Sequence, residues 1–191
     1  MTVGCEREFA TVNALLATKF DTRGVDAFCL AWIKYERQLR KVAAFLVYQS
    51  SELGRSEKPA LREVIRSKKT ISHISLRGSI SLLCGAKFSQ LIGDDYASLS
   101  HSLSSSYNAR QKIVHGQQTG LRLSRENLEE KVHHIQRWCM LFSDSSYDRF
   151  GYDGFGGKTS LFKSNNATLS KAIDEQLAIA NGWAEFVRTR F

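Results

Sequence analysis

Apolar residues recur along most of the chain at steps of three or four, which is the spacing of one face of an α-helix. The longest such stripe runs from Val25 to about Leu53 and predicts a long core helix. Its members are Phe28, Trp32, Tyr35, Leu39, Val42, Leu46 and Leu53. Strand-like alternation is rare and Pro59 is the single proline, so we predict an all-α protein.

Shorter periodic stretches predict the remaining helices. We expect them over residues 3–20, 60–67, 71–84, 125–142 and 168–190, with one more that begins near residue 94 and carries residues 99–114. Ser124 is a suitable N-cap, and Asp94 and Asp95 favour a helix N-terminus. The limits of the 71–84 helix stay open, because this stretch is rich in serine and interrupted by Gly78.

A glycine- and aromatic-rich segment separates the last two predicted helices. We therefore divide the chain into a helical bundle over residues 1–142, a loop over residues 143–167 and a C-terminal helix over residues 168–191 that packs on the bundle. The loop either presents its aromatic rings and Lys158 to single-stranded RNA bases or folds those rings onto the bundle. The rings belong to Tyr147, Phe150, Tyr152 and Phe155. Tyr152 stands where a P-loop requires glycine, so ATP binding is not expected.

Charge adds information about the partner. Lys and Arg outnumber Asp and Glu, giving a net charge of +8 and an isoelectric point near 9.5. Such a surplus attracts phosphate backbones without selecting a sequence. Nucleic acid is therefore the leading class of partner.

Composition also excludes several classes of protein. No apolar run approaches the roughly 20 residues that span a bilayer, and the first residues lack the pattern of a signal peptide. We therefore expect a cytoplasmic protein without a membrane partner. The four cysteines form no C-x-x-C pair and are expected to be reduced thiols. Neither a metal nor another cofactor is expected.

The stretch from Asn108 to Gly116 carries the strongest chemical signal, since Arg110 and His115 supply both parts of metal-free RNA cleavage. Arginine offers a permanent charge and a forked donor for phosphate oxygens. Histidine exchanges protons near neutral pH with a ribose 2′-hydroxyl or a leaving 5′-oxygen. The attacking group lies within the substrate, so a 2′,3′-cyclic phosphate is the expected first product.

Helix geometry constrains this pair. A separation of five residues rotates a helix by about 500°, which leaves the two side chains about 140° apart in direction. Two solutions exist: the helix ends or distorts at His115 and Gly116, or two copies of the motif meet across a two-fold axis and complete a shared site. A surface arginine followed by a capping histidine is the structural alternative.

The segment Ala109-Arg-Gln-Lys-Ile-Val-His-Gly116 resembles the R-x4-H motif of HEPN ribonucleases, in which a small residue follows the histidine. The resemblance implies a helical bundle of four to five core helices, here with an additional C-terminal helix. It also implies a homodimer in which two motifs line one cleft and cut RNA without metal. Many members are toxins of toxin–antitoxin systems or phage-defence effectors, so an antitoxin or regulatory protein is a further implied partner.

A second stretch, over residues 26–40, resembles the second helix of RiboL-PSP-type HEPN domains, with Trp32 followed by Glu36. Glu36 would orient His115 or hold Arg110, or else it is a solvated residue beside a core tryptophan. The chain departs from the family where Gln111 replaces the frequent Asn. Gln117 stands where HepT-type toxins carry a tyrosine, which argues against that branch.

We therefore expect an endoribonuclease with Arg110, His115 and Glu36 as catalytic residues. RNA contacts are expected from Asn108, Gln111, Lys112, Arg37 and Lys158. The alternative is a catalytically silent HEPN-like module that binds nucleic acid or a partner protein. A basic cluster, formed by Arg62, Arg66, Lys68 and Lys69, either follows the RNA backbone, contacts an acidic antitoxin, or is a solvated helix face.

Overall fold

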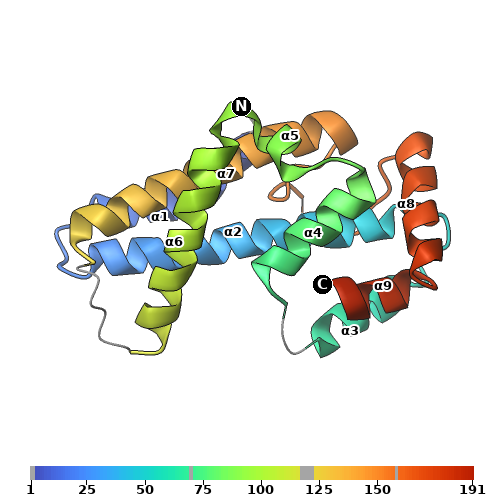
Figure 1. The fold of residues 1–191 in the computed structure, drawn as a ribbon, viewed down its shortest axis with the longest axis horizontal. Helices are drawn as coiled ribbons and strands as arrows, with labels where there is room; N and C mark the ends of the chain where they lie inside the picture. Colours follow the sequence, from blue (N-terminus) through green and yellow to red (C-terminus); the bar gives the residue numbers. More distant parts are fainter. Residues whose placement is uncertain (1–2, 69–70, 117–122, 158) are drawn as a thin grey trace.

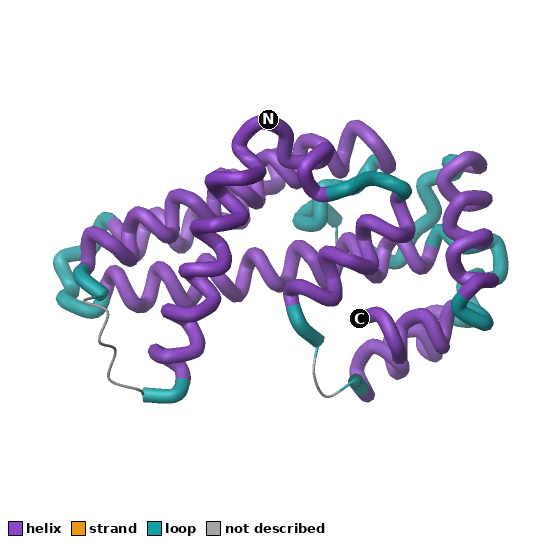
Figure 2. The backbone as a smooth tube through the Cα atoms, in the orientation of Figure 1, coloured by secondary structure: helices purple, strands orange, loops and turns teal. Residues whose placement is uncertain are grey.

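A computed structural model describes residues 3–68, 71–116, 123–157 and 159–191, and all regular secondary structure in these residues is helical (Figure 1, Figure 2). The helices are α1 (Val3–Leu16), α2 (Arg23–Tyr48), α3 (Lys58–Ser67), α4 (His73–Cys84), α5 (Phe88–Ile92), the short 3-10 helix η1 (Gly93–Asp95), α6 (Tyr96–Val114), α7 (Arg125–Phe150), α8 (Ala167–Ile179) and α9 (Trp183–Arg190). The all-α prediction is confirmed.

The long helix α2 forms the centre of the core. Its predicted apolar stripe is almost fully buried, because α1, α4 and α7 pack around it. From Val42 to Ser50 every residue is buried, so the C-terminal half of α2 is covered on all sides. Continuous burial of this kind requires partners for the polar side chains as well as for the apolar ones.

Two buried glutamines, Gln38 on α2 and Gln49 at its C-cap, form hydrogen bonds to the segment that follows α7. Gln38 donates from Nε2 to the carbonyl oxygens of Cys139 (3.0 Å) and Asp153 (3.1 Å). Gln49 donates to the carbonyl oxygen of Phe162 (2.8 Å) and accepts from the backbone N–H of Ser164 (2.9 Å). These contacts hold the glycine-rich segment against α2.

The aromatic residues of this segment consequently face the core. Phe150, Tyr152 and Phe155 are buried, and the Tyr152 ring lies 5.0 Å from that of Phe45. Of the four rings predicted to face RNA, Tyr147, on α7, is the exposed one. The interpretation in which the loop presents Phe150, Tyr152 and Phe155 to RNA bases is therefore wrong, and the segment folds these rings onto the bundle.

Two predicted boundaries are also wrong. Residues 143–150 continue α7, which ends where Gly151 adopts a positive φ of 77°. Its buried face continues through Ser143 and Ser146, which an apolar pattern does not register. The predicted C-terminal helix is two helices, α8 and α9. Asn181 and Gly182, with φ of 59° and 103°, interrupt the helical conformation between them.

α4 and α6 lie on the same side of α2. In Figure 1, α6 crosses in front of α2, and the ring of Tyr107 on α6 lies 6.0 Å from that of Trp32 on α2. His73, the first residue of α4, lies 5.2 Å from the same tryptophan ring. Trp32 thus brings together the N-terminal end of α4 and the C-terminal part of α6.

In the described part of the chain, no helix has the length and apolar character to cross a membrane.

Gly154 provides a test of how tightly the loop is held against α2. It has φ of 84°, and a Cβ atom there would lie 2.6 Å from Cγ of Gln38. We expect Gly154→Ala to lower the free energy of unfolding by about 2 kcal/mol, through backbone strain and overpacking. Urea denaturation measures this change.

Gly78 offers the matched control, because it is exposed within α4 and a Cβ atom there would meet nothing within 4 Å. Gly78→Ala is expected to raise the free energy of unfolding by roughly 0.5–1 kcal/mol, as alanine favours a helix interior. Equal effects of the two substitutions would contradict the tight packing of Gly154.

Candidate functional site

The R-x4-H motif lies at the C-terminal end of α6. The backbone N–H of His115 still donates to the carbonyl oxygen of Gln111 (3.1 Å), so helical geometry persists through Val114, and His115 is the C-cap of α6 with φ of −91° and ψ of 6°. The positive φ begins only at Gly116, at 61°. The helix therefore does not distort early enough to bring His115 round to Arg110, and the two side chains leave α6 about 140° apart.

Arg110 is half-buried and held by its neighbours. It donates from Nη1 to Oε1 of Gln111 (2.5 Å), and Gln111 donates from Nε2 to the hydroxyl of Tyr107 (3.1 Å). Among the residues that the structure describes, no carboxylate forms an ion pair with Arg110. Its charge acts on Cys29 of α2: burial and Asp26 raise the pKa of that thiol, and Arg110 opposes the rise.

Glu36 has a different partner from the one predicted. Its Oε1 accepts a hydrogen bond from Nε1 of Trp32 at 2.9 Å. Cys29 and Glu36 lie on one face of α2, but they are separated by about 10.5 Å along its axis. In the described residues, no ion pair joins Glu36 to Arg110.

The other predicted RNA contacts are dispersed. Asn108 is exposed and Lys112 is half-buried on α6, so both lie near the motif. Arg37 instead faces α1, where it pairs with Glu8 at 2.8 Å. Lys158 lies outside the described residues. Among the predicted RNA contacts that the structure describes, those on α6 therefore lie next to Arg110.

The basic cluster on α3 is partly used in packing. Lys68 donates to the carbonyl oxygen of Arg188 in α9 at 2.8 Å. Arg62 and Arg66 are exposed. Lys69 lies outside the described residues.

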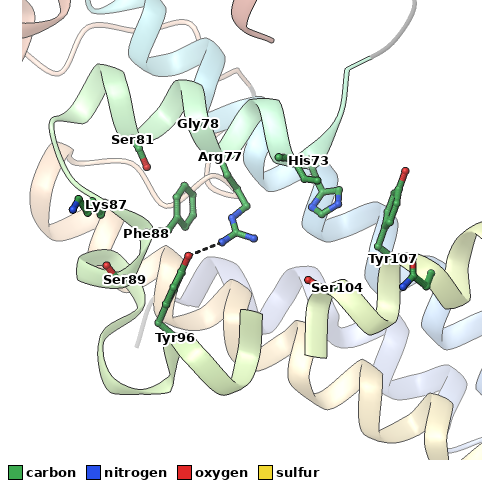
Figure 3. A pocket seen from close by; sticks show the side chains of 12 residues that line it. His73, Arg77, Gly78, Ser81, Lys87, Phe88, Ser89, Tyr96, Ser104 and Tyr107 are labelled. Atoms are coloured by element: carbon green, nitrogen blue, oxygen red, sulfur yellow. Dashed lines mark hydrogen bonds between the residues drawn. The ribbon is translucent and has the colours of Figure 1, made fainter. Parts of the chain in front are cut away.

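A groove between α4 and α6 is a feature that the sequence did not reveal. It has a volume of about 630 Å³ and is lined by residues of α4, of the start of α5 and of α6. These are His73, Ile74, Arg77, Gly78, Ser81, Lys87, Phe88, Ser89, Tyr96, Ser104, Tyr107 and Asn108. Figure 3 shows Arg77 pointing from α4 toward Tyr96, with His73 and Tyr107 near the other end. The i, i+4 spacing of His73 and Arg77 was the one available signal, since it places both on one helix face.

His73 is buried at the floor of this groove. Its Nδ1 lies 3.2 Å from the hydroxyl of Tyr35, and its ring lies 5.0 Å from that of Tyr107. Burial lowers the pKa of His73 to about 4, and the charge of Arg77 acts in the same direction. The imidazole is therefore neutral at pH 7.

Arg77 lies among aromatic rings. Its guanidinium carbon is 4.6 Å from the ring centroid of Trp138 and 5.1 Å from that of Phe88, and Nη2 donates to the hydroxyl of Tyr96 at 3.3 Å. Within the described ranges, no carboxylate pairs with this arginine either. The groove thus contains a half-buried charge whose neighbours are uncharged.

Comparison with models of protein families, with curated proteins and with solved structures found no match to this chain. The described residues also contain no group of three or more His, Cys, Asp or Glu side chains placed to hold a metal ion.

The neutral His73 predicts loss of stability in acid. Its folded pKa of about 4 lies below the ordinary value of 6.5, so the unfolded chain binds the extra proton as the pH falls through this interval. We expect the free energy of unfolding to fall by about 2 kcal/mol from His73 alone between these pH values. Urea denaturation at pH 6.5, 5.5 and 4.5, taken roughly across that window, measures the slope.

His73→Gln retains polarity without this titration, so its pH slope should be shallower than that of the unmodified chain. His101→Gln, at an exposed histidine of α6, is the matched control and should leave the slope unchanged. Identical slopes for all three proteins would show that His73 titrates normally.

Proposed function

We propose that the protein is a metal-independent endoribonuclease that acts as a homodimer through Arg110 and His115. The observation that carries this proposal is the end of α6, where an exposed histidine follows a half-buried arginine that has no acidic partner in the described residues. The resemblance to HEPN ribonucleases suggests the roles of these two residues, phosphate binding by the arginine and proton transfer by the histidine. A guanidinium without a carboxylate is available to a phosphate.

The reaction uses only groups of the RNA and the two side chains. A neutral His115 accepts the proton of a ribose 2′-hydroxyl, and the 2′-oxygen forms a bond to phosphorus as the bond to the 5′-oxygen breaks. Arg110 stabilises the negative charge on the non-bridging oxygens, and His115, now protonated by the 2′-hydroxyl, passes that proton to the leaving 5′-oxygen. The products are a 2′,3′-cyclic phosphate and a 5′-hydroxyl.

Two observations support a second copy in this site. Regular helical geometry through Val114 keeps the side chains of Arg110 and His115 of one chain directed away from each other. Val114 is 57% exposed beside the motif, and Ile33 is 58% exposed on the face of α2 that carries Cys29. Both side chains offer apolar area that a protein interface would remove from water. A two-fold dimer would place the arginine of one chain beside the histidine of its partner.

The biological setting follows from the resemblance. Toxin or phage-defence activity, control by an antitoxin or regulatory protein, and action on RNA in the cytosol are the properties that HEPN ribonucleases suggest. The excess of basic residues is consistent with an RNA substrate.

Cleavage in the presence of EDTA tests the proposal. The unmodified protein should cut single-stranded RNA and leave 2′,3′-cyclic phosphate ends, and Arg110→Ala or His115→Ala should each lower the rate by about 100-fold or more. His101→Ala, at an exposed histidine of the same helix, should retain full activity. Cleavage that survives both motif substitutions, or that EDTA abolishes, would refute the mechanism.

Mixing inactive variants tests the shared site. If arginine and histidine come from different chains, a mixed dimer of Arg110→Ala and His115→Ala contains one intact site. We expect co-refolded equal amounts to recover about a quarter of the activity, as statistical pairing gives half of the dimers one site out of two. No recovery, with mixed dimers confirmed by mass, would place both groups of each site in one chain.

Glu36 is expected to support the fold without transferring a proton, since its partner is Trp32. Glu36→Gln retains an oxygen that accepts from the indole N–H, so it should change the cleavage rate by less than about threefold. A loss comparable to that of His115→Ala, together with a changed pH–rate profile, would restore Glu36 to the catalytic set.

The second candidate function is a silent module that binds nucleic acid or a partner protein. The contacts of Arg110 with Gln111, and of Gln111 with Tyr107, favour this alternative because they give the arginine a structural role. RNA binding without cleavage, undiminished by Arg110→Ala, would identify the module.

A further inference from the structure

The α4–α6 groove has the electrostatic character of an anion site. Arg77 and Lys87 are among its lining residues, and none of the described residues that line it is an aspartate or a glutamate. Arg77 is also partly withdrawn from water by the rings of Trp138 and Phe88. A desolvated guanidinium without a carboxylate binds phosphate oxygens more strongly than a fully hydrated one.

The opposite end of the groove has the character of a base site. Tyr107 is half-buried, and Asn108 next to it is exposed and lines the groove. An aromatic face stacks on a nucleobase, and an amide both donates to and accepts from the edge of a base. Ser104, one turn earlier on α6, is exposed between this end and Arg77 (Figure 3).

The floor of the groove holds a buried polar atom without a partner. Nδ1 of His73 lies 3.2 Å from the hydroxyl of Tyr35. Nε2 of the same ring is buried and has no hydrogen-bond partner in the described residues.

We propose that the α4–α6 groove binds a nucleoside monophosphate unit, with its phosphate on Arg77 and its base on Tyr107 and Asn108. The unit is either a free mononucleotide or one residue of an RNA strand, which share this chemistry. Its volume of about 630 Å³ lies within the range of small-ligand sites. This assignment is independent of the proposed cleavage, because it involves neither Arg110 nor His115.

Isothermal titration calorimetry on the full chain tests the assignment. The probes are AMP, GMP, CMP and UMP, adenosine and inorganic phosphate as single parts, and a short RNA whose 2′-hydroxyls are methylated. Methylation removes the attacking group, so the RNA stays intact even if the protein is a ribonuclease. We expect a mononucleotide to bind at least about tenfold more tightly than adenosine or phosphate alone, since one site contacts both parts.

Two substitutions locate the binding. Arg77→Gln removes the phosphate contact and should weaken binding by about tenfold or more. Because Arg77 also packs on Trp138, Ser104→Trp provides a second variant that fills the groove from an exposed position. Ser98→Trp, exposed on α6 outside the groove lining, and Lys171→Ala, exposed on α8, are the matched controls and should bind as the unmodified protein does.

The outcomes separate the two sources of the ligand. Mononucleotide binding that Ser104→Trp abolishes assigns the groove to free nucleotides, whereas binding of the methylated RNA alone, lost in the same variant, assigns it to a strand. Absence of binding by every probe, or binding that neither Arg77→Gln nor Ser104→Trp weakens, overturns the proposal. Loss of cleavage in Arg110→Ala with nucleotide binding intact would leave the groove assignment standing.

Discussion

The complete burial of the C-terminal half of α2 is the constraint on which the rest of the structure depends. Apolar packing against α1, α4 and α7 supplies most of the favourable free energy, but it also removes Gln38 and Gln49 from water. Burying an amide group without hydrogen-bond partners would destabilise the fold by about 1–3 kcal/mol. Backbone groups of residues 151–164 bind Nε2 of Gln38 and both polar atoms of the Gln49 side chain, so the segment that looks like a free loop is part of the core.

Sequence patterns predicted those helices and helix ends whose buried faces are apolar. The stripe of α2 was found because nearly every buried residue on its inner face is apolar. The prediction ended α7 too early because the buried face of this helix continues through Ser143 and Ser146, which are small and polar. The break between α8 and α9 was missed because Asn181 supplies a positive φ that a search for proline does not detect.

The candidate site was predicted only where it is local in sequence. Arg110 and His115 lie in one motif, and helix geometry alone indicated that they leave α6 in different directions. The α4–α6 groove depends on two helices that meet through Trp32, a tertiary contact that no local spacing contains. The partner of Glu36 was also missed. Its carboxylate accepts from the indole N–H of Trp32, four residues earlier in the same helix.

Tyr107 belongs to both regions. Its ring forms a wall of the groove and packs against Trp32 and His73, while its hydroxyl accepts from Gln111, which in turn accepts from Arg110. A ligand that changes the rotamer of Tyr107 therefore removes the acceptor of Gln111 and alters the freedom of the arginine. If both regions bind ligands, such coupling is reciprocal in free energy, so a ligand on Arg110 and a ligand in the groove change each other's affinity by the same factor. The phenol ring of Tyr107 is the contact that would carry this coupling.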